Sequence, residues 1–227
     1  MNLLVLSLLA AVTSWLGCAL VKSNAARWHL VDIPGARSSH VNPTARGGGL
    51  GIVVAFYGSM LVLMLCGDLD TAAMRLLIPL LMIAVLGFID DVSTLGVGAR
   101  LFFQFACSIA IVIMVFPDFL MDDVLPVKSM AGKLWGADST THAWLNYAMG
   151  IGFVIYLVWL INLYNFMDGI DGIAVTQTAS VLSGAILISW LQGGHAEHAQ
   201  WWLLLAACGG FFVWNRAPAQ LFMGDVG

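Results

Sequence analysis

The stretch LNYAMGIGFVIYLVWLINLY, residues 145–164, decides the fold because it contains no charged side chain. A helix of about 20 apolar residues is long enough to cross the hydrocarbon core of a lipid bilayer. Six further stretches are similarly apolar: residues 3–21, 47–66, 72–89, 101–117, 172–191 and 200–214. We therefore predict an all-α fold, a polytopic transmembrane helix bundle of about seven spans that forms a single transmembrane domain over residues 1–227.

The composition also favours a membrane protein. The 227 residues are 60% hydrophobic and 10% charged, with a mean hydropathy of +0.91, whereas soluble domains are about 25% charged. A β-barrel would show alternating segments of about ten residues, but these stretches are apolar on every side. The nine Lys and Arg residues are spread along the chain without a basic cluster, so no nucleic-acid partner is expected.

The distribution of Lys and Arg predicts the orientation in the membrane. Seven spans place six of these cations on one face and three on the other, and cytoplasmic loops carry the excess of positive charge. The face with six cations is therefore predicted to be cytoplasmic. The first group is Lys22, Arg27, Arg37, Arg46, Arg100 and Arg216, and the second is Arg75, Lys128 and Lys133.

Four polar segments fall on the predicted cytoplasmic face. They are residues 32–49, Asp90 with Asp91, residues 162–172, and residues 223–227. Counting the spans places all four segments on the same side of the membrane. By itself this is modest support for one shared site, so the chemistry of each segment also has to favour it.

Asp90 and Asp91 follow directly on an apolar stretch, where an unpaired carboxylate is costly unless it is solvated or neutralised. Adjacent helical residues project about 100° apart, so one carboxylate can face a metal while the other faces a proton or a second ligand. The alternative is a pair of solvated acids at the end of a helix. The dipeptide indicates a candidate catalytic pair and leaves this simpler interpretation open.

Asn162, Asn165, Asp168 and Asp171 recur at every third residue where the span 145–164 ends. Neighbouring members of such a series lie on one side of a helix. Glycines directly after the two aspartates would let backbone approach a ligand closely, as phosphate sites require. The alternative is a helix-terminal turn that uses Asn and Asp as caps. We predict that the four residues contribute to a ligand site.

Asp225, in the sequence GDVG at residues 224–227, adds a third source of carboxylate. Carboxylates that are brought together raise one another's pKa values unless a cation compensates them. Hard oxygen donors select Mg²⁺, Mn²⁺ or Ca²⁺ over zinc, and Mg²⁺ commonly combines one or two protein ligands with substrate phosphates. The aspartates therefore predict a Mg²⁺ site, with Mn²⁺ as the alternative cofactor.

The loop RSSHVNPTARGGG, residues 37–49, combines cations and a histidine with a glycine run before a predicted helix. Arg side chains and exposed N–H groups at a helix N-terminus both bind phosphate oxygens. Arg37, His40, Arg46 and Gly48 are therefore predicted to bind a substrate that carries phosphate. The alternative is an ordinary positive-inside loop with a flexible hinge.

Together the segments resemble the polyprenyl-phosphate N-acetylhexosamine-1-phosphate transferases, the bacterial glycosyltransferase 4 family that also includes phospho-N-acetylmuramoyl-pentapeptide transferase. The resemblance is carried by residues 32–49, LGFIDD at 86–91, NLYNFMDGIDG at 162–172, and WN through FMGDVG at 214–227. The third and fourth of these motifs are highly specific. NLYNFMDGIDG looks closest to members that initiate O-antigen or related surface polysaccharides.

The resemblance implies transfer of a sugar 1-phosphate from a UDP-N-acetylhexosamine to undecaprenyl phosphate, with release of UMP. It also implies Mg²⁺ and an active site at the cytoplasmic face of the bacterial inner (plasma) membrane. Carried across by resemblance, Asn165 and Asp225 would mark the Mg²⁺ site, Asp90 or Asp91 would assist the lipid phosphate, and Asp168 and Asp171 would organise the nucleotide sugar. Asn162 joins the predicted substrate-binding residues. Contact with membrane lipid and a homodimer are further expectations, and the sequence does not specify the sugar.

Members of the family continue for several more helices and a His-containing cytoplasmic loop beyond the point that matches Gly227. We therefore expect this chain to be an N-terminal fragment of a longer protein, and an inactive lipid-binding fragment is one alternative function. A membrane transporter or cation channel is another, because intramembrane carboxylates also mark ion pathways. A transporter, however, should show acids near mid-span and repeat symmetry, which this sequence lacks.

Overall fold

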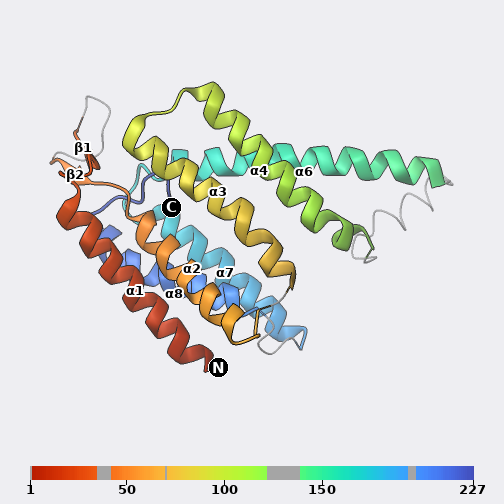
Figure 1. Ribbon diagram of the computed structural model, residues 1–227, viewed down its shortest axis with the longest axis horizontal. Helices are drawn as coiled ribbons and strands as arrows, with labels where there is room; N and C mark the ends of the chain where they lie inside the picture. The colour runs from red at the N-terminus through yellow and green to blue at the C-terminus, as the bar shows by residue number, and fades with distance from the viewer. Residues whose placement is uncertain (1, 35–41, 70, 122–138, 194–197) are drawn as a thin grey trace.

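A computed structural model of the chain describes residues 2–34, 42–69, 71–121, 139–193 and 198–227 (Figure 1). In these ranges the chain is built of helices and one short hairpin, which confirms the predicted all-α polytopic bundle. The elements are α1 (Leu3–Asn24), β1 (Val31–Asp32), β2 (Thr44–Ala45), α2 (Gly49–Leu65), α3 (Thr71–Ser93), α4 (Val97–Met121), α6 (Ser139–Met167), α7 (Ile173–Leu191) and α8 (Ala199–Asn215).

Within the described ranges, five helices are long and apolar enough to cross a membrane, so the chain is an integral membrane protein. They are Leu3–Asn24, Ala73–Ser93, Val97–Val115, Tyr147–Met167 and Ile173–Leu191. The predicted spans 47–66 and 200–214 correspond to α2 and α8, which have 17 residues each. Helices of that length are at the lower limit for crossing a bilayer. Five of the seven predicted spans are confirmed, and the count of seven is not.

Helix α3 is longer than the span predicted there, because it continues through both aspartates to Ser93. The polar groups at this end have partners: Ser93 Oγ donates to the Ile89 carbonyl, and the Leu95 N–H donates to Asp90 Oδ1. Asp90 and Asp91 therefore project from a helix into the protein, with only 7% and 2% of their surfaces exposed. This burial excludes the interpretation in which both acids are solvated at a helix end.

Helix α6 ends at Met167, so the series of four polar residues is divided between a helix and a turn. Asn162 and Asn165 belong to the last turns of α6, whereas Asp168 and Asp171 lie in the connection to α7. Gly172 has a φ of +75°, which side chains other than glycine rarely allow, and α7 begins directly after it. The expectation that the series shares one helical face is therefore wrong for its second half.

Helices α1, α2 and α8 pack side by side (Figure 1), and small residues bring their backbones together. A Cβ atom on Gly51 would lie 2.6 Å from Cys18 Sγ, and one on Gly210 would lie 2.2 Å from the Ala11 carbonyl oxygen. Small residues permit this approach in lipid, where close packing is a main source of helix association. The three helices form a core that supports the polar segments at one end of the bundle.

We expect Gly210→Ala to lower the thermal stability of the protein in detergent, at a cost of about 1–3 kcal/mol from overpacking. The added methyl group would meet a backbone oxygen of α1, which cannot rotate away. Gly209→Ala is the matched control, because a Cβ atom there has no other atom within 4 Å. Thermal unfolding that ranks the two variants as equal would contradict the close contact between α1 and α8.

The C-terminal segment, residues 221–227, returns to the start of α2. Strands β1 and β2 pair antiparallel, and Ala45 of β2 also forms a parallel bridge with Leu221. The N–H groups of Gly48 and Gly49 donate to the carbonyls of Phe222 and Met223, both at 2.9 Å. Figure 1 shows the C-terminus near the end of the bundle that carries the hairpin, away from the N-terminus. Residues from opposite ends of the sequence thus form one layer.

Candidate active site

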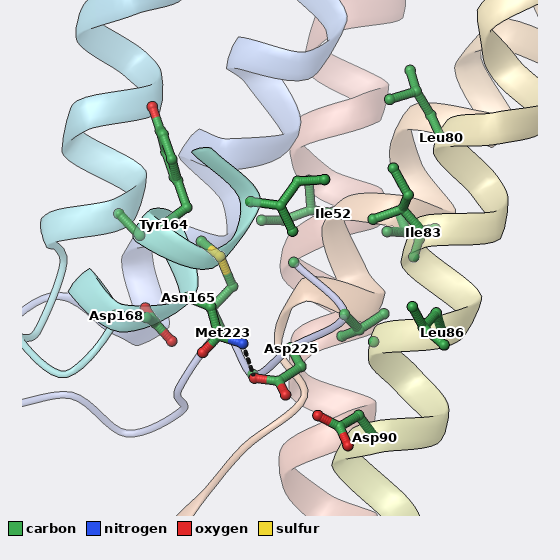
Figure 2. A pocket seen from close by; sticks show the side chains of 18 of the residues that line it. Ile52, Leu80, Ile83, Leu86, Asp90, Tyr164, Asn165, Asp168, Met223 and Asp225 are labelled. Atoms are coloured by element: carbon green, nitrogen blue, oxygen red, sulfur yellow. Dashed lines mark hydrogen bonds between the residues drawn. The ribbon is translucent and has the colours of Figure 1, made fainter. Parts of the chain in front are cut away.

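Segments that are distant in the sequence meet at this end of the bundle. Figure 2 shows Asp90 on α3, Asn165 near the end of α6, Asp168 just after it, and Asp225 from the C-terminal segment, gathered around one opening. The loop before α2 joins them through Arg46, which hydrogen-bonds to α3. The structure therefore brings together all four segments that the sequence placed on one membrane face.

Asp91 is enclosed by backbone groups. Its Oδ1 accepts the N–H of Asp225 at 3.1 Å, and its Oδ2 accepts the N–H of Val226 at 3.2 Å. Arg46 Nη2 donates to the Asp91 carbonyl oxygen, and the Arg46 charge also acts on the Asp91 carboxylate. Asp91 therefore connects α3 both to the C-terminal segment and to the loop before α2.

Asp90 faces a different partner, the guanidinium group of Arg100 in the first turn of α4. Arg100 Nη1 lies 2.9 Å from Asp90 Oδ2 and 3.7 Å from Asp225 Oδ2. The Arg100 side chain is 30% exposed. A guanidinium group has five N–H donors, so Arg100 can hold both carboxylates and still present donors to another anion.

The Asp225 carboxylate is oriented by an amide. Its Oδ1 accepts a hydrogen bond from Asn165 Nδ2 at 2.9 Å, the contact drawn in Figure 2. Burial, followed by the neighbouring Asp90 and Asp91 carboxylates, raises the pKa of Asp225 to about 7, although the Asn165 amide acts to lower it. The two residues predicted to mark the metal site are thus in direct contact.

Asp168 lies close to the same group of acids. Burial, and then the charges of Asp225, Asp91 and Asp171, raises the pKa of Asp168 to about 7, while a hydrogen bond from the Gly224 backbone acts to lower it. For both Asp168 and Asp225 burial is the main cause of the raised pKa, and repulsion from the neighbouring carboxylates adds to it. A cation bound among them would offset that repulsion.

The outer members of the polar series contact neighbouring segments. Asp171 Oδ2 accepts the Ala219 N–H at 2.9 Å, which ties the turn before α7 to the chain after α8. Asn162 Nδ2 donates to Gln104 Oε1 on α4 at 2.8 Å and to the Val158 carbonyl at 2.7 Å. The roles predicted for these two residues toward a substrate stay predictions.

The loop before α2 differs in part from its predicted role. Gly48 is buried, and a Cβ atom there would lie 2.3 Å from Phe211 Cε2. Its N–H already donates to Phe222, so Gly48 has a packing role and no free N–H to support the predicted phosphate contact. Arg46 reaches the site beside Asp91. Arg37 and His40 lie outside the described residues.

A pocket of about 380 Å³ opens beside the carboxylates. Its charged and amide lining residues are Asp90, Arg100, Gln104, Asn165, Asp168 and Asp225, and most of the remaining walls are apolar. In Figure 2, Leu86, Ile83 and Leu80 follow one another along α3 away from Asp90, with Ile52 close to them. The pocket has a charged end and apolar walls, which suits an amphiphilic ligand with a charged head.

The donor set fits a hard divalent cation that is bound partly by other ligands. In the part of the chain that the structure describes, no three His, Cys, Asp or Glu side chains are arranged to hold a metal ion by themselves. Mg²⁺, however, is usually bound through one or two carboxylates together with phosphate oxygens and water. Asp225 with the neighbouring Asn165 meets this smaller requirement, because one carboxylate and one amide lie in direct contact at the pocket.

Sequence reasoning did not assign Arg100 or Asn215 to the site. Asn215 is 1% exposed; its Oδ1 accepts the Gly172 N–H and its Nδ2 donates to the Leu221 carbonyl, both at 3.0 Å. It therefore fixes the start of α7 against the C-terminal segment. The sequence did contain a signal for each residue. Asn215 is an amide at the end of an apolar stretch, and Arg100 is a cation shortly after two acids.

Comparisons with known proteins agree on one family. The model of glycosyl transferase family 4 matches residues 73–227. A phospho-N-acetylmuramoyl-pentapeptide-transferase of Frankia casuarinae is 30% identical over an alignment that covers 84% of this chain and 61% of the relative. A Bacillus subtilis protein named as a probable undecaprenyl-phosphate N-acetylglucosaminyl 1-phosphate transferase is 27% identical, with 92% of this chain and 54% of the relative covered. The chain thus spans between half and two thirds of the length of these relatives.

Proposed function

The chain belongs to glycosyl transferase family 4, and on this premise we propose that it takes part in moving a sugar 1-phosphate from a UDP-sugar to undecaprenyl phosphate, with release of UMP. The donor in this proposal is a UDP-N-acetylhexosamine, and the product starts a polysaccharide such as O-antigen. The reaction takes place at the cytoplasmic face of the bacterial inner membrane and depends on Mg²⁺. This activity is proposed for a protein of the length of these relatives, of which the chain spans a part.

The observation that carries this proposal is the joining of a carboxylate cluster to an apolar pocket. Asp90, Arg100 and Asp225 line the charged end of that pocket, and α3 residues such as Ile83 line its walls. A polyprenyl phosphate has the matching construction, because it joins one phosphate group to a long hydrocarbon chain. Its tail would stay in apolar surroundings while its phosphate met the charged residues.

The reaction needs little covalent chemistry from the protein, because phosphoryl transfer depends mainly on positioning and on stabilising charge. An oxygen of the lipid phosphate attacks the phosphorus that carries the sugar, the bond from that phosphorus to UMP breaks, and UMP leaves. Asn165 and Asp225 would hold Mg²⁺, which supplies charge stabilisation for the pyrophosphate when bound. Arg100 is placed to attract an anionic phosphate, and the Arg100 contact keeps Asp90 at the pocket.

We expect membranes that carry the full-length protein to release UMP and form a lipid-linked sugar when they receive radiolabelled undecaprenyl phosphate, Mg²⁺ and a UDP-N-acetylhexosamine. A panel of UDP-sugars would identify the reaction class and the donor in one experiment. Membranes without the protein give the background rate. Absence of product with every UDP-sugar would overturn the proposed function, and carrier binding without turnover would favour a lipid-binding role.

A further inference from the structure

The neighbouring acids Asp90 and Asp91 have different surroundings, although they are adjacent in the sequence. Asp90 lines the pocket and pairs with Arg100, whereas Asp91 is 2% exposed and is not among the residues that line the pocket. Both oxygens of Asp91 are engaged by the backbone N–H groups of Asp225 and Val226. Only the first acid is therefore placed to meet a ligand in the pocket.

The backbone around Asp91 is shaped to receive its carboxylate. Gly224 has a φ of +74°, and a Cβ atom there would lie 2.6 Å from Asp91 Oδ2. One helical turn before Asp91, a Cβ atom on Gly87 would lie 1.9 Å from the Asp225 carbonyl oxygen. Residues 87 and 91 share one face of α3 because they are four apart. The turn at residues 224–226 packs against this face of α3.

We propose that Asp91 is a positioning residue that holds the Asp225 carboxylate in place through the backbone, and that it does not itself contact substrate or metal. Asp225 is then held at two points: Asp91 binds its backbone N–H, and Asn165 and Arg100 contact its carboxylate. Arg46 in turn supports Asp91 from the loop before α2. The activity part of this inference rests on the proposed function, whereas its structural part does not.

Hydrogen exchange of the backbone tests the structural part directly. In Asp91→Asn the amide oxygen can accept one N–H, but the amide NH₂ would face the other N–H, so two donors meet. We expect a peptide that contains Asp225 and Val226 to exchange about tenfold faster or more in this variant, because a protecting hydrogen bond is lost. Ser93→Ala is the matched control at the same helix end, since Ser93 Oγ donates to the Ile89 carbonyl within α3.

The dependence of the transferase rate on Mg²⁺ separates positioning from a general loss of folding. In the full-length protein, Asp91→Asn should raise the Mg²⁺ concentration for half-maximal rate by about tenfold or more, with part of the rate regained at high Mg²⁺. Asp91→Ala, which keeps no acceptor, should be more severely affected than Asp91→Asn. A variant that had merely lost folded protein would show a lower rate with the same half-maximal concentration.

Gly224→Ala tests the same contact from the C-terminal segment, because its methyl group would displace the Asp91 carboxylate. If both changes break one contact, the double variant should be no worse than the more affected single variant. Unchanged exchange at Asp225 and Val226 in Asp91→Ala would overturn the inference. If the full-length protein transfers no sugar phosphate at all, the proposed function fails while the exchange result still decides the role of Asp91.

Discussion

Asp225→Asn is expected to abolish Mg²⁺-dependent release of UMP by the full-length protein, with a loss of at least about 10²-fold. Changes to groups around a metal ligand cost 10- to 100-fold, so loss of the ligand charge should cost more. The substitution keeps the shape of the side chain, and its amide oxygen can still accept the hydrogen bond from Asn165. The expected effect is therefore on charge and metal binding, with the local structure retained.

The pKa of Asp225 predicts how this variant behaves without a metal. Since its folded-state pKa is raised to about 7, the protonated form stabilises the folded protein at low pH, and that contribution is lost as the pH rises through 7. A neutral amide avoids this loss. We expect the Tm of Asp225→Asn at pH 8, without divalent cations, to be no lower than that of the unmodified protein.

Two comparisons complete this test. Mg²⁺ should raise the Tm of the unmodified protein and leave that of Asp225→Asn unchanged, because a ligand stabilises only the state that binds it. Asp68→Asn, an exposed position in the connection between α2 and α3, is the control and should retain both the rate and the Mg²⁺ response. Near-normal turnover by Asp225→Asn would remove Asp225 from the metal site.

Gly87→Ala is the second change for which we expect a large loss, about 10²-fold in the transferase rate. The new methyl group would lie 1.9 Å from the Asp225 carbonyl oxygen and 2.8 Å from the Val226 nitrogen. Both are backbone atoms, so the turn itself has to move away from α3. A misplacement of about 1 Å near reacting groups can cost about 10²-fold in rate. The measurement is UMP release, together with the Tm in detergent.

Gly58→Ala is the control for Gly87→Ala, because it also adds a methyl group to an apolar helix but meets no atom within 4 Å. Alanine favours a helix by about 1 kcal/mol over glycine, so the control should be as stable as the unmodified protein or slightly more so. If Gly87→Ala and Gly58→Ala have the same transferase rate, the position of the turn that carries Asp225 does not depend on its packing against α3.

The fold could be predicted from the sequence because lipid restricts the choices. A backbone in hydrocarbon must satisfy its own polar groups, so apolar stretches such as residues 145–164 had to be helices. The convergence of Asp90, Asn165 and Asp225 was also predicted, from the span count together with the chemistry of each polar segment, and the structure shows these residues in contact or near contact. The residues at which helices end were harder to predict from the sequence. Helix α3, for example, continues through two acids whose partners are distant in the sequence.

The contacts inside the site could not be predicted in the same way. Nothing local distinguishes Asp91, which binds backbone at residues 225 and 226, from Asp90, which pairs with Arg100. Gly48 looked like a phosphate-binding glycine, but its N–H is taken by Phe222. These assignments depend on which distant segment packs against each residue, and a single sequence carries little information about such packing.

The layer formed by β2, the start of α2 and residues 221–227 has a consequence for biosynthesis. The N–H groups of Gly48 and Gly49 emerge from the ribosome long before the carbonyls of Phe222 and Met223 that accept them. Helices α1 and α2 are therefore made while this edge still lacks its hydrogen-bond partners. The carboxylate cluster can be assembled only after residues 221–227 have been made, so an early and a late part of this chain must both be present before the cluster forms.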